Sequence, residues 1–150
     1  MANTRKSSIL VLNGPNLNML GRREPDVYGT ISLDEVEKMT RAHAASLGLK
    51  VDFRQSNHEG QLVDWIQAAG DHDAIIINAA GLTHTSIAIF DALKFAGLPV
   101  IEVHLSNIYR REAFRQNSYI SRIAHGVICG FGATGYRLAV DAVADILASS

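Results

Sequence analysis

Short runs of apolar and β-branched residues alternate along the chain with longer segments of helical periodicity. Such runs are typical of strands that are buried on both faces. The predicted strands span residues 8–14, 50–56, 73–79, 99–105 and 126–131. Between and after them, the apolar spacing predicts helices over 32–48, 59–70, about 84–97 and 136–148. Ser32 and Glu35 have the spacing of a capping box, and Gly48 ends the first of these helices.

This alternation predicts a parallel sheet, because parallel neighbours are joined by crossover helices that cover both faces. The expected fold class is α/β, a flavodoxin-like doubly wound sheet of five parallel strands in a single domain over residues 1–150. Residues 1–6 are expected to form a frayed start. Ligands bind such sheets beyond the carboxyl ends of the strands, so functional residues are expected just after each strand.

Composition narrows the classes of partner. The chain has 14 basic and 15 acidic residues and a net charge of −1, which predicts no general attraction to nucleic acid or to an anionic membrane. It has no apolar stretch of membrane length and no basic-then-apolar leader, so a soluble, cytoplasmic protein is expected. Cys129 is the only cysteine, and its apolar neighbours predict a buried small hydrophobe.

Polar side chains gather where the predicted strands end. The first strand is followed by a connection of about 18 residues, NGPNLNMLGRREPDVYGT, where about two to six are usual, and a functional lid is expected there. The residues expected at this edge are Asn16, Arg23, Tyr28, Asn78, His84, Glu102, His104, Ser106, Arg111 and Arg115. Amides, imidazoles, cations and one phenol dominate the set, which holds a single carboxylate.

Two nucleotide- or phosphate-related functions fit this edge poorly. GFGATG (130–135) matches the G-x-G-x-x-G pattern of dinucleotide sites, but it lies in the last strand–helix unit, with no following strand to carry a ribose-binding acid. A tight turn needed for packing is the favoured interpretation. A phosphorelay receiver needs acidic residues where this chain has Asn13 and Asn78.

Metal and serine chemistry are also disfavoured. No histidine pair has a zinc-binding spacing, and Glu102 with His104 gives too few ligands, so no metal site is predicted. Ser86 lies near His84 without a nucleophile elbow, and a helix cap explains it better. Glu102 and His104 are two apart on a strand, so they share a face and the carboxylate can hold the imidazole as a general acid. A purely structural histidine at a strand end remains the alternative.

Three longer segments resemble a known family. LNGPNLNMLGRREPDVYG, NAAGLTHTS and IEVHLSNIYRREAFRQNSYIS are similar, in order and spacing, to the signature segments of type II 3-dehydroquinate dehydratases. The resemblance extends from about residue 8 to residue 148. It implies a hydro-lyase that removes water reversibly from 3-dehydroquinate to give 3-dehydroshikimate, in the shikimate pathway of aromatic amino acid biosynthesis, with no metal or organic cofactor.

The resemblance implies catalytic roles for five residues. Tyr28 is the implied base that takes a proton from the carbon next to the ketone. Arg23 is the implied cation that lowers the pKa of the tyrosine and stabilises enolate charge. His104 is the implied acid for the leaving hydroxyl and is oriented by Glu102. Asn16 is implied to hold the catalytic groups and a water near the enolate oxygen.

The same resemblance implies how substrate is bound. The groups that bind its carboxylate and hydroxyls come from the later strand ends: Asn78, His84, Leu105, Ser106, Arg111 and Arg115. Leu105 and Ser106 contribute through their backbone amides. Asp91 is implied to reach in from a neighbouring subunit of a homo-oligomer, a dodecamer built from trimers.

Elementary chemistry agrees with a tyrosine base assisted by arginine. A free tyrosine, with a pKa near 10, is ionised in about one molecule in a thousand at pH 7. A neighbouring cation lowers a pKa by roughly one to three units, and a guanidinium stays charged throughout. The four lysines, Lys6, Lys38, Lys50 and Lys94, fall away from the expected site edge, which disfavours the imine chemistry of a type I enzyme.

The segment HTSIAIFDALKFAG leaves almost no polar face on its helix, whereas Arg137, Asp141 and Asp145 give the last helix a wet stripe. A helix that is apolar nearly all round is expected to be covered on both sides. Its outer side is therefore predicted to contact another subunit, with Asp91 buried at the contact. The alternative is a core helix within one chain, with Asp91 near an exposed end.

A second class of function stays open at this stage. A non-catalytic flavodoxin-like module that binds a small polyhydroxy acid would share the amides and the arginines. It would have no need of Tyr28 or of the Glu102–His104 pair.

Overall fold

The centre of the protein is a sheet of five parallel strands. The computed structural model describes residues 5–22 and 24–149, and at Tyr28 it describes the backbone alone. The strands are β1 (Ser8–Asn13), β2 (Lys50–Gln55), β3 (Ala74–Asn78), β4 (Val100–His104) and β5 (Gly126–Cys129). Their order is β2-β1-β3-β4-β5, and every neighbouring pair is parallel. This is the order of a flavodoxin-like sheet, which confirms the predicted fold class.

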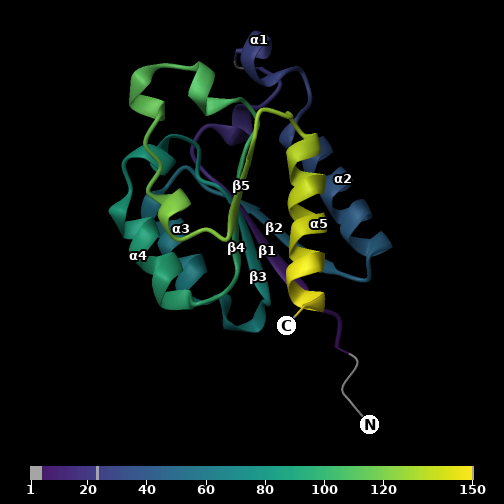
Figure 1. Cartoon of the computed structure of the whole chain (residues 1–150). Helices are drawn as coiled ribbons and strands as arrows, with labels where there is room; N and C mark the ends of the chain where they lie inside the picture. The colour runs from purple at the N-terminus through teal and green to yellow at the C-terminus, as the bar shows by residue number, and fades with distance from the viewer. Residues whose placement is uncertain (1–4, 23, 150) are drawn as a thin grey trace.

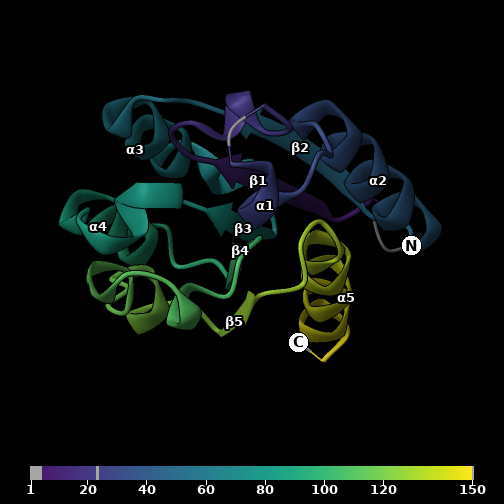
Figure 2. The same cartoon turned by 90° about the horizontal axis from the view of Figure 1, so that it is seen from above.

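Helices cover both faces of the sheet (Figures 1 and 2). One face carries α2 (Leu33–Ser46) and α5 (Thr134–Ala148), and the other carries α3 (Glu59–Gln67) and α4 (Ile87–Ala96). The alternation of side chains along β1 divides the core accordingly, since Ile9 and Val11 join the first layer while Leu10 and Leu12 join the second. All four are fully buried, as expected of a strand covered on both faces.

The capping box at the start of α2 is confirmed. The Ser32 hydroxyl accepts a hydrogen bond from the backbone N–H of Glu35 at 3.2 Å, and the Glu35 carboxylate accepts one from the N–H of Ser32 at 3.4 Å. Gly48 follows the helix with a φ of 74°, a conformation that glycine adopts without strain.

Short one-turn elements, which the periodicity did not indicate, occupy the connections. The helix α1 (Pro25–Tyr28) lies within the long connection after β1. The 3-10 helices are η1 (Leu17–Met19), η2 (Ala69–Asp71), η3 (Ala80–His84), η4 (Ile108–Arg110), η5 (Ala113–Arg115) and η6 (Ile120–Arg122). The three that follow β4 (η4, η5 and η6) form a rim at the carboxyl edge of the sheet.

Two expectations differ from the structure. His84 ends η3, and α4 begins only after Ser86, whose hydroxyl accepts from the N–H of Ile89 at 2.9 Å and so caps the helix. Cys129 is half-buried because β5 is the edge strand and has a neighbour on one side alone. Residues 1–4 of the expected frayed start lie outside the described residues, so that expectation stays a prediction. Arg5, which is described, pairs with Asp73 at 3.1 Å.

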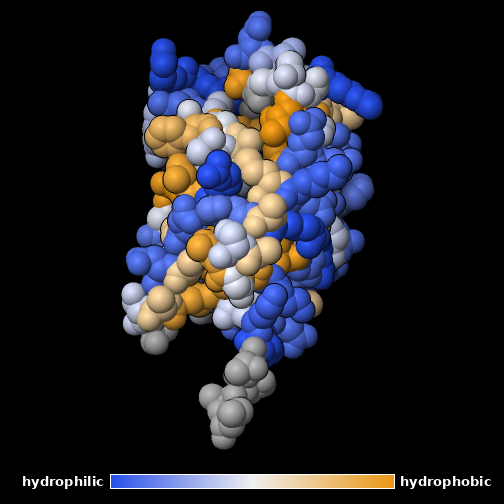
Figure 3. Space-filling model, turned by 90° about the vertical axis from the view of Figure 1, so that its right-hand side faces the viewer, coloured by the Kyte–Doolittle hydropathy of each residue, from blue (hydrophilic) through white to orange (hydrophobic). Residues whose placement is uncertain are grey.

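The outer side of α5 is polar, as predicted. Arg137, Asp141 and Asp145 are all exposed there, and hydrophilic residues cover much of the face that carries α2 and α5 (Figure 3). In the described part of the chain, no helix is long and apolar enough to cross a membrane.

Candidate active site

A pocket of about 190 Å³ opens at the carboxyl edge of the sheet. Its wall comes from the connections after β1, β3 and β4 and from the rim that follows. Of the residues predicted from the strand ends, the structure brings these together in its lining: Asn16, Asn78, His84, His104, Leu105, Ser106, Arg111 and Arg115. Residues separated by up to about 100 positions in the sequence thus meet, as the rule for parallel sheets requires.

Glu102 and His104 form the predicted pair. Both lie on β4 and are buried, and His104 Nε2 lies 2.5 Å from Glu102 Oε2. Burial raises the pKa of Glu102, but the hydrogen bonds from His104, Ser121 and Ser118 together outweigh it and hold the pKa below its ordinary value. The carboxylate is therefore charged at neutral pH, so Nε2 carries a proton. The other ring nitrogen, Nδ1, can therefore exchange a proton with a ligand.

Two serines of the rim, which the sequence reasoning missed, complete the shell of Glu102. The Ser118 hydroxyl donates to Oε2 at 2.8 Å, and the Ser121 hydroxyl donates to Oε1 at 2.5 Å. Both come from the segment NSYIS around η6. A buried carboxylate with three donors is satisfied in its charged form, so it keeps a fixed orientation toward His104.

His84 lies beside His104, with the ring centroids 6.4 Å apart and the rings nearly parallel. Its Nδ1 lies 2.8 Å from the backbone oxygen of Asn117. A carbonyl only accepts, so Nδ1 carries the proton and Nε2 of the neutral ring is an acceptor. Burial is the main cause that lowers the pKa of His84, and it favours this neutral form. His84 can therefore accept a hydrogen bond from a hydroxyl in the pocket.

Positive charge faces the pocket from the rim. The side chains of Arg111 and Arg115 are largely covered, and Arg111 Nη1 donates to the hydroxyl of Ser106 at 3.3 Å. Arg115 pairs with the exposed Glu112 at 3.3 Å. Guanidinium groups at the wall of a small pocket favour an anionic ligand.

Asn16, in the connection after β1, and Asn78, at the end of β3, bring amides to the pocket. Asn16 has a φ of 73°, and its backbone N–H donates to Asn57 Oδ1 at 2.9 Å. Asparagine is among the few residues that tolerate this left-handed conformation, which turns the chain over the pocket at this point. Asn78 ends β3 and is buried.

The structure describes little of the predicted base, Tyr28, and of its assisting cation, Arg23. Arg23 lies outside the described residues, and Tyr28 is described as the last backbone position of α1. Glu24, just before α1, lies 3.7 Å from Arg111 in an ion pair. The segment also faces the site, because Asp26, Val27 and Gly29 line a second hollow together with Leu105, Ser106 and Arg111. The connection after β1 therefore lies over the edge of the pocket.

Asp91 is not brought into the pocket of its own chain. It is exposed on α4, on the side away from the sheet. A role for Asp91 at a site therefore requires a second subunit.

The glycine-rich turn has a packing role in the structure. The N–H of Gly132 donates to the backbone oxygen of Leu105 at 2.9 Å, which ties the turn to the segment after β4. At Gly135, an added Cβ would lie 3.5 Å from both Val103 and Ile128, so the helix packs closely on the sheet. Both contacts favour the turn interpretation of GFGATG. Among the described residues, no group of three or more histidine, cysteine, aspartate and glutamate side chains could hold a metal ion.

Comparisons with known proteins agree with one another. A family model described as Dehydroquinase class II matches residues 7–144. A 3-dehydroquinate dehydratase from Brucella canis is 56% identical over 140 residues, which are 93% of this chain and 89% of that protein. The crystal structure of a type II dehydroquinase from Propionibacterium acnes superposes with a TM-score of 0.90 at 44% identity, covering 95% of this chain and 99% of that one. A type II dehydroquinase from Butyrivibrio crossotus gives a TM-score of 0.90 at 42% identity, covering 92% and 97%.

Proposed function

This chain belongs to the class II dehydroquinase family and is a hydro-lyase, and we propose that it converts 3-dehydroquinate reversibly to 3-dehydroshikimate through an enolate intermediate. The observation that carries the proposal is the hydrogen bond between His104 and Glu102, a charged carboxylate that accepts three hydrogen bonds in all. The pocket lined by His104 also contains two arginines. Loss of water needs an acid for the hydroxyl, and recognition of the substrate carboxylate needs cations. The pocket supplies both.

His104 is the proposed acid. Its Nδ1 gives a proton to the leaving hydroxyl, while Nε2 keeps its hydrogen bond to the Glu102 carboxylate. Between turnovers, exchange with water returns a proton to the ring and removes the one taken by the base. The position of His104 in the pocket lining supports this role over a purely structural one.

Tyr28 is the proposed base, assisted by Arg23. Removal of the proton next to the ketone creates enolate charge, which a guanidinium stabilises along with the ionised phenol. The ion pair between Glu24 and Arg111 supports this role, because it ties the segment that carries both residues to the pocket wall. Asn16 is proposed to hold a water near the enolate oxygen.

The remaining groups are proposed to bind substrate. Arg111 and Arg115 suit its carboxylate, and Nε2 of His84 suits a hydroxyl donor. Asn78 and the backbone amides of Leu105 and Ser106 offer further donors. No group in this scheme calls for a metal or an organic cofactor, and the proposed setting is the cytoplasmic shikimate pathway.

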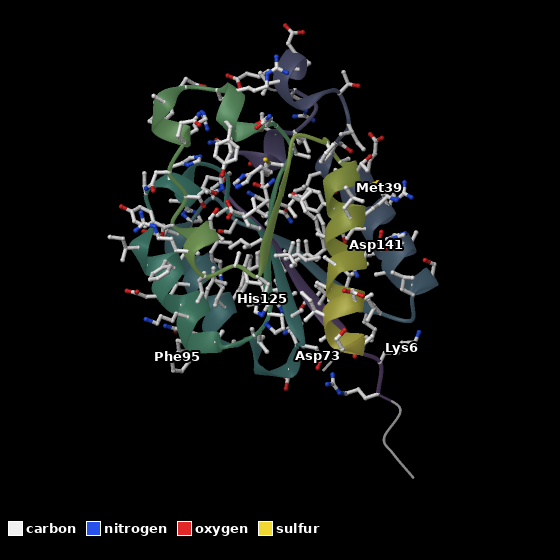
Figure 4. The ribbon with its side chains drawn as sticks, viewed as in Figure 1. Lys6, Met39, Asp73, Phe95, His125 and Asp141 are labelled. Atoms are coloured by element: carbon white, nitrogen blue, oxygen red, sulfur yellow. The ribbon has the colours of Figure 1, made fainter. Side chains whose placement is uncertain are left out.

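We also propose that the active form is a homo-oligomer, a dodecamer built from trimers. On α4, Ile87 is 56% exposed and Phe95 is 78% exposed, and Phe95 projects outward from the end of the helix (Figure 4). An apolar helix face of this kind is typical of a subunit contact. Asp91 lies on the same outer side, from which it would reach the site of a neighbouring subunit.

The proposal is tested by mixing the purified protein with 3-dehydroquinate and following the ultraviolet absorbance of the enone product. A catalyst gives a steady rise, and His104→Ala abolishes it. His125→Ala is the matched control, because His125 lies away from the pocket before β5 and its loss is expected to leave turnover unchanged (Figure 4). Binding of 3-dehydroquinate without any enone signal would identify a binding module instead of an enzyme.

A further inference from the structure

A buried chain of hydrogen bonds runs beneath the pocket and joins β1, β3 and α5. Tyr136, on the first turn of α5, is 1% exposed. Its hydroxyl donates to Asn13 Oδ1 at 2.6 Å and accepts from Asn78 Nδ2 at 3.1 Å. Figures 1 and 2 show α5 against the sheet, with this first turn at the same end as α1. Of the three residues, Asn78 is the one that lines the pocket.

The donor and acceptor roles in this series of hydrogen bonds are fixed at Asn13, the end farther from the pocket. Asn13 Nδ2 donates to the backbone oxygen of Arg54 at 3.0 Å, and a carbonyl oxygen can only accept. The amide of Asn13 therefore turns its oxygen toward Tyr136, and the hydroxyl must donate. Burial raises the pKa of Tyr136, so the hydroxyl keeps the proton that this bond needs.

The direction is set again at the pocket end. A hydroxyl that has donated its one proton must accept its next bond, so Asn78 has to present its nitrogen to Tyr136. On the other side of the amide, the backbone N–H of Ala80, which can only donate, bonds to Asn78 Oδ1 at 3.2 Å. A reversed Asn78 amide would lose both bonds in a buried place, which is costly.

We propose that Tyr136 is a positioning residue that fixes the amide of Asn78 so that its second N–H points to an acceptor oxygen of the substrate. The amide nitrogen carries two N–H groups, and Tyr136 takes one. The other serves a carboxylate, ketone or hydroxyl oxygen in the pocket. This role rests on the proposed dehydratase function, because Asn78 is taken there as a substrate-binding group.

Tyr136 lies where the first turn of α5 packs on the sheet. Tyr136 directly follows Gly135, where an added Cβ would already be in van der Waals contact with Val103 and Ile128. This is an ordinary contact distance, so the first turn of α5 lies directly on β4 and β5. The turn that precedes α5 therefore sets where the helix begins, and Tyr136 in its first turn lies with its hydroxyl beside Asn78.

The test is Tyr136→Phe, which removes the hydroxyl and keeps the ring that packs 6.3 Å from Phe53. Because Asn78 then loses its fixed orientation, the KM for 3-dehydroquinate is expected to rise roughly tenfold, while kcat stays within about twofold. A role confined to folding would instead lower kcat per mole of total chain and leave KM unchanged. Thr40→Val is the matched control, since it deletes a buried hydroxyl that bonds within α2 to Val36.

The coupling to Asn78 is tested in a double-mutant cycle. In an Asn78→Ala background, Tyr136→Phe is expected to cause no further rise in KM. An unchanged KM for Tyr136→Phe in an otherwise active enzyme overturns the positioning role and leaves the proposed function intact.

If the native protein produced no enone, the proposed function would fail, and the positioning role would then be decided without activity. The side-chain amide signal of Asn78, assigned in NMR spectra through Asn78→Ala, is expected to exchange with solvent at least about tenfold faster in Tyr136→Phe, because its buried partner is lost. Equal exchange in the two proteins overturns the inference.

Discussion

Oε2 of Glu102 lies 2.5 Å from Nε2 of His104 in the interior of the protein, and the opposite oxygen of the same carboxylate is bonded to Ser121. A carboxylate held in this way cannot turn from the imidazole without leaving a donor unsatisfied. The imidazole of the proposed acid is thus oriented by the carboxylate, and His104 lines the pocket.

The hydrogen bonds of Ser118 and Ser121 to Glu102 are expected to make the free energy of unfolding depend on pH. The pKa of Glu102 is below its ordinary value, so the native state favours the charged form; this stabilisation is present above the unfolded pKa and is lost as the pH falls through the native one. Ser118→Ala with Ser121→Ala is expected to lower the free energy of unfolding by about 1–3 kcal/mol at pH 7 and by less at pH 3. Denaturant titrations at both pH values measure this, with the exposed Ser46→Ala as control. An equal loss at both pH values would contradict it.

His84 is expected to remain neutral wherever the enzyme is active. Burial lowers its pKa, and Nδ1 is engaged with Asn117. An NMR titration of the His84 ring should therefore show a midpoint below its ordinary value of 6.5. His84→Ala is expected to raise KM roughly tenfold through the loss of an acceptor for a substrate hydroxyl. A midpoint at or above 6.5 would rule out the neutral acceptor.

Turnover is expected to need neither metal nor imine. Dialysis against a chelator should leave the rate unchanged. Borohydride added in the presence of substrate should also leave it unchanged, because no lysine is among the described residues that line the pocket. Loss of activity under borohydride would reveal a Schiff base, and loss under the chelator would reveal a required metal. Either result removes the tyrosine–histidine scheme.

Sites shared between subunits are tested by co-expression. Oligomers made only of Tyr28→Phe chains, or only of Asp91→Ala chains, are each expected to have low activity. Mixed at random and in equal amounts around a closed ring, about a quarter of the sites would combine an intact Tyr28 with an intact Asp91 from the neighbour. Activity no higher than the mean of the two parents, or a monomer in sedimentation, would contradict shared sites.

Sequence patterns were sufficient for the sheet and for most of the pocket. Continuous apolar runs identify strands buried on both faces, and the carboxyl-edge rule then brings Asn78, His104 and Arg115 together. Other features have no such signal. The single turns after β4 are too short for periodicity, so nothing in NSYIS indicated that Ser118 and Ser121 would bond to Glu102.

The buried hydrogen bonds of Tyr136 beneath the site could not be predicted from the sequence either. The glycine pattern before Tyr136 indicates a tight turn, but not that the next hydroxyl lies between Asn13 and Asn78. That relationship depends on how closely α5 packs against the sheet, which is a property of the folded core.

In the proposed mechanism, a phenolate in the connection after β1 removes the proton and His104 supplies the acid. Tyr28→Phe is the decisive substitution, because it keeps the ring and deletes the ionisable oxygen. The enone assay is expected to show a fall in kcat of at least about a hundredfold, while calorimetry shows 3-dehydroquinate binding within a few-fold of the native affinity. A variant that retains near-native kcat would show that Tyr28 is not the base.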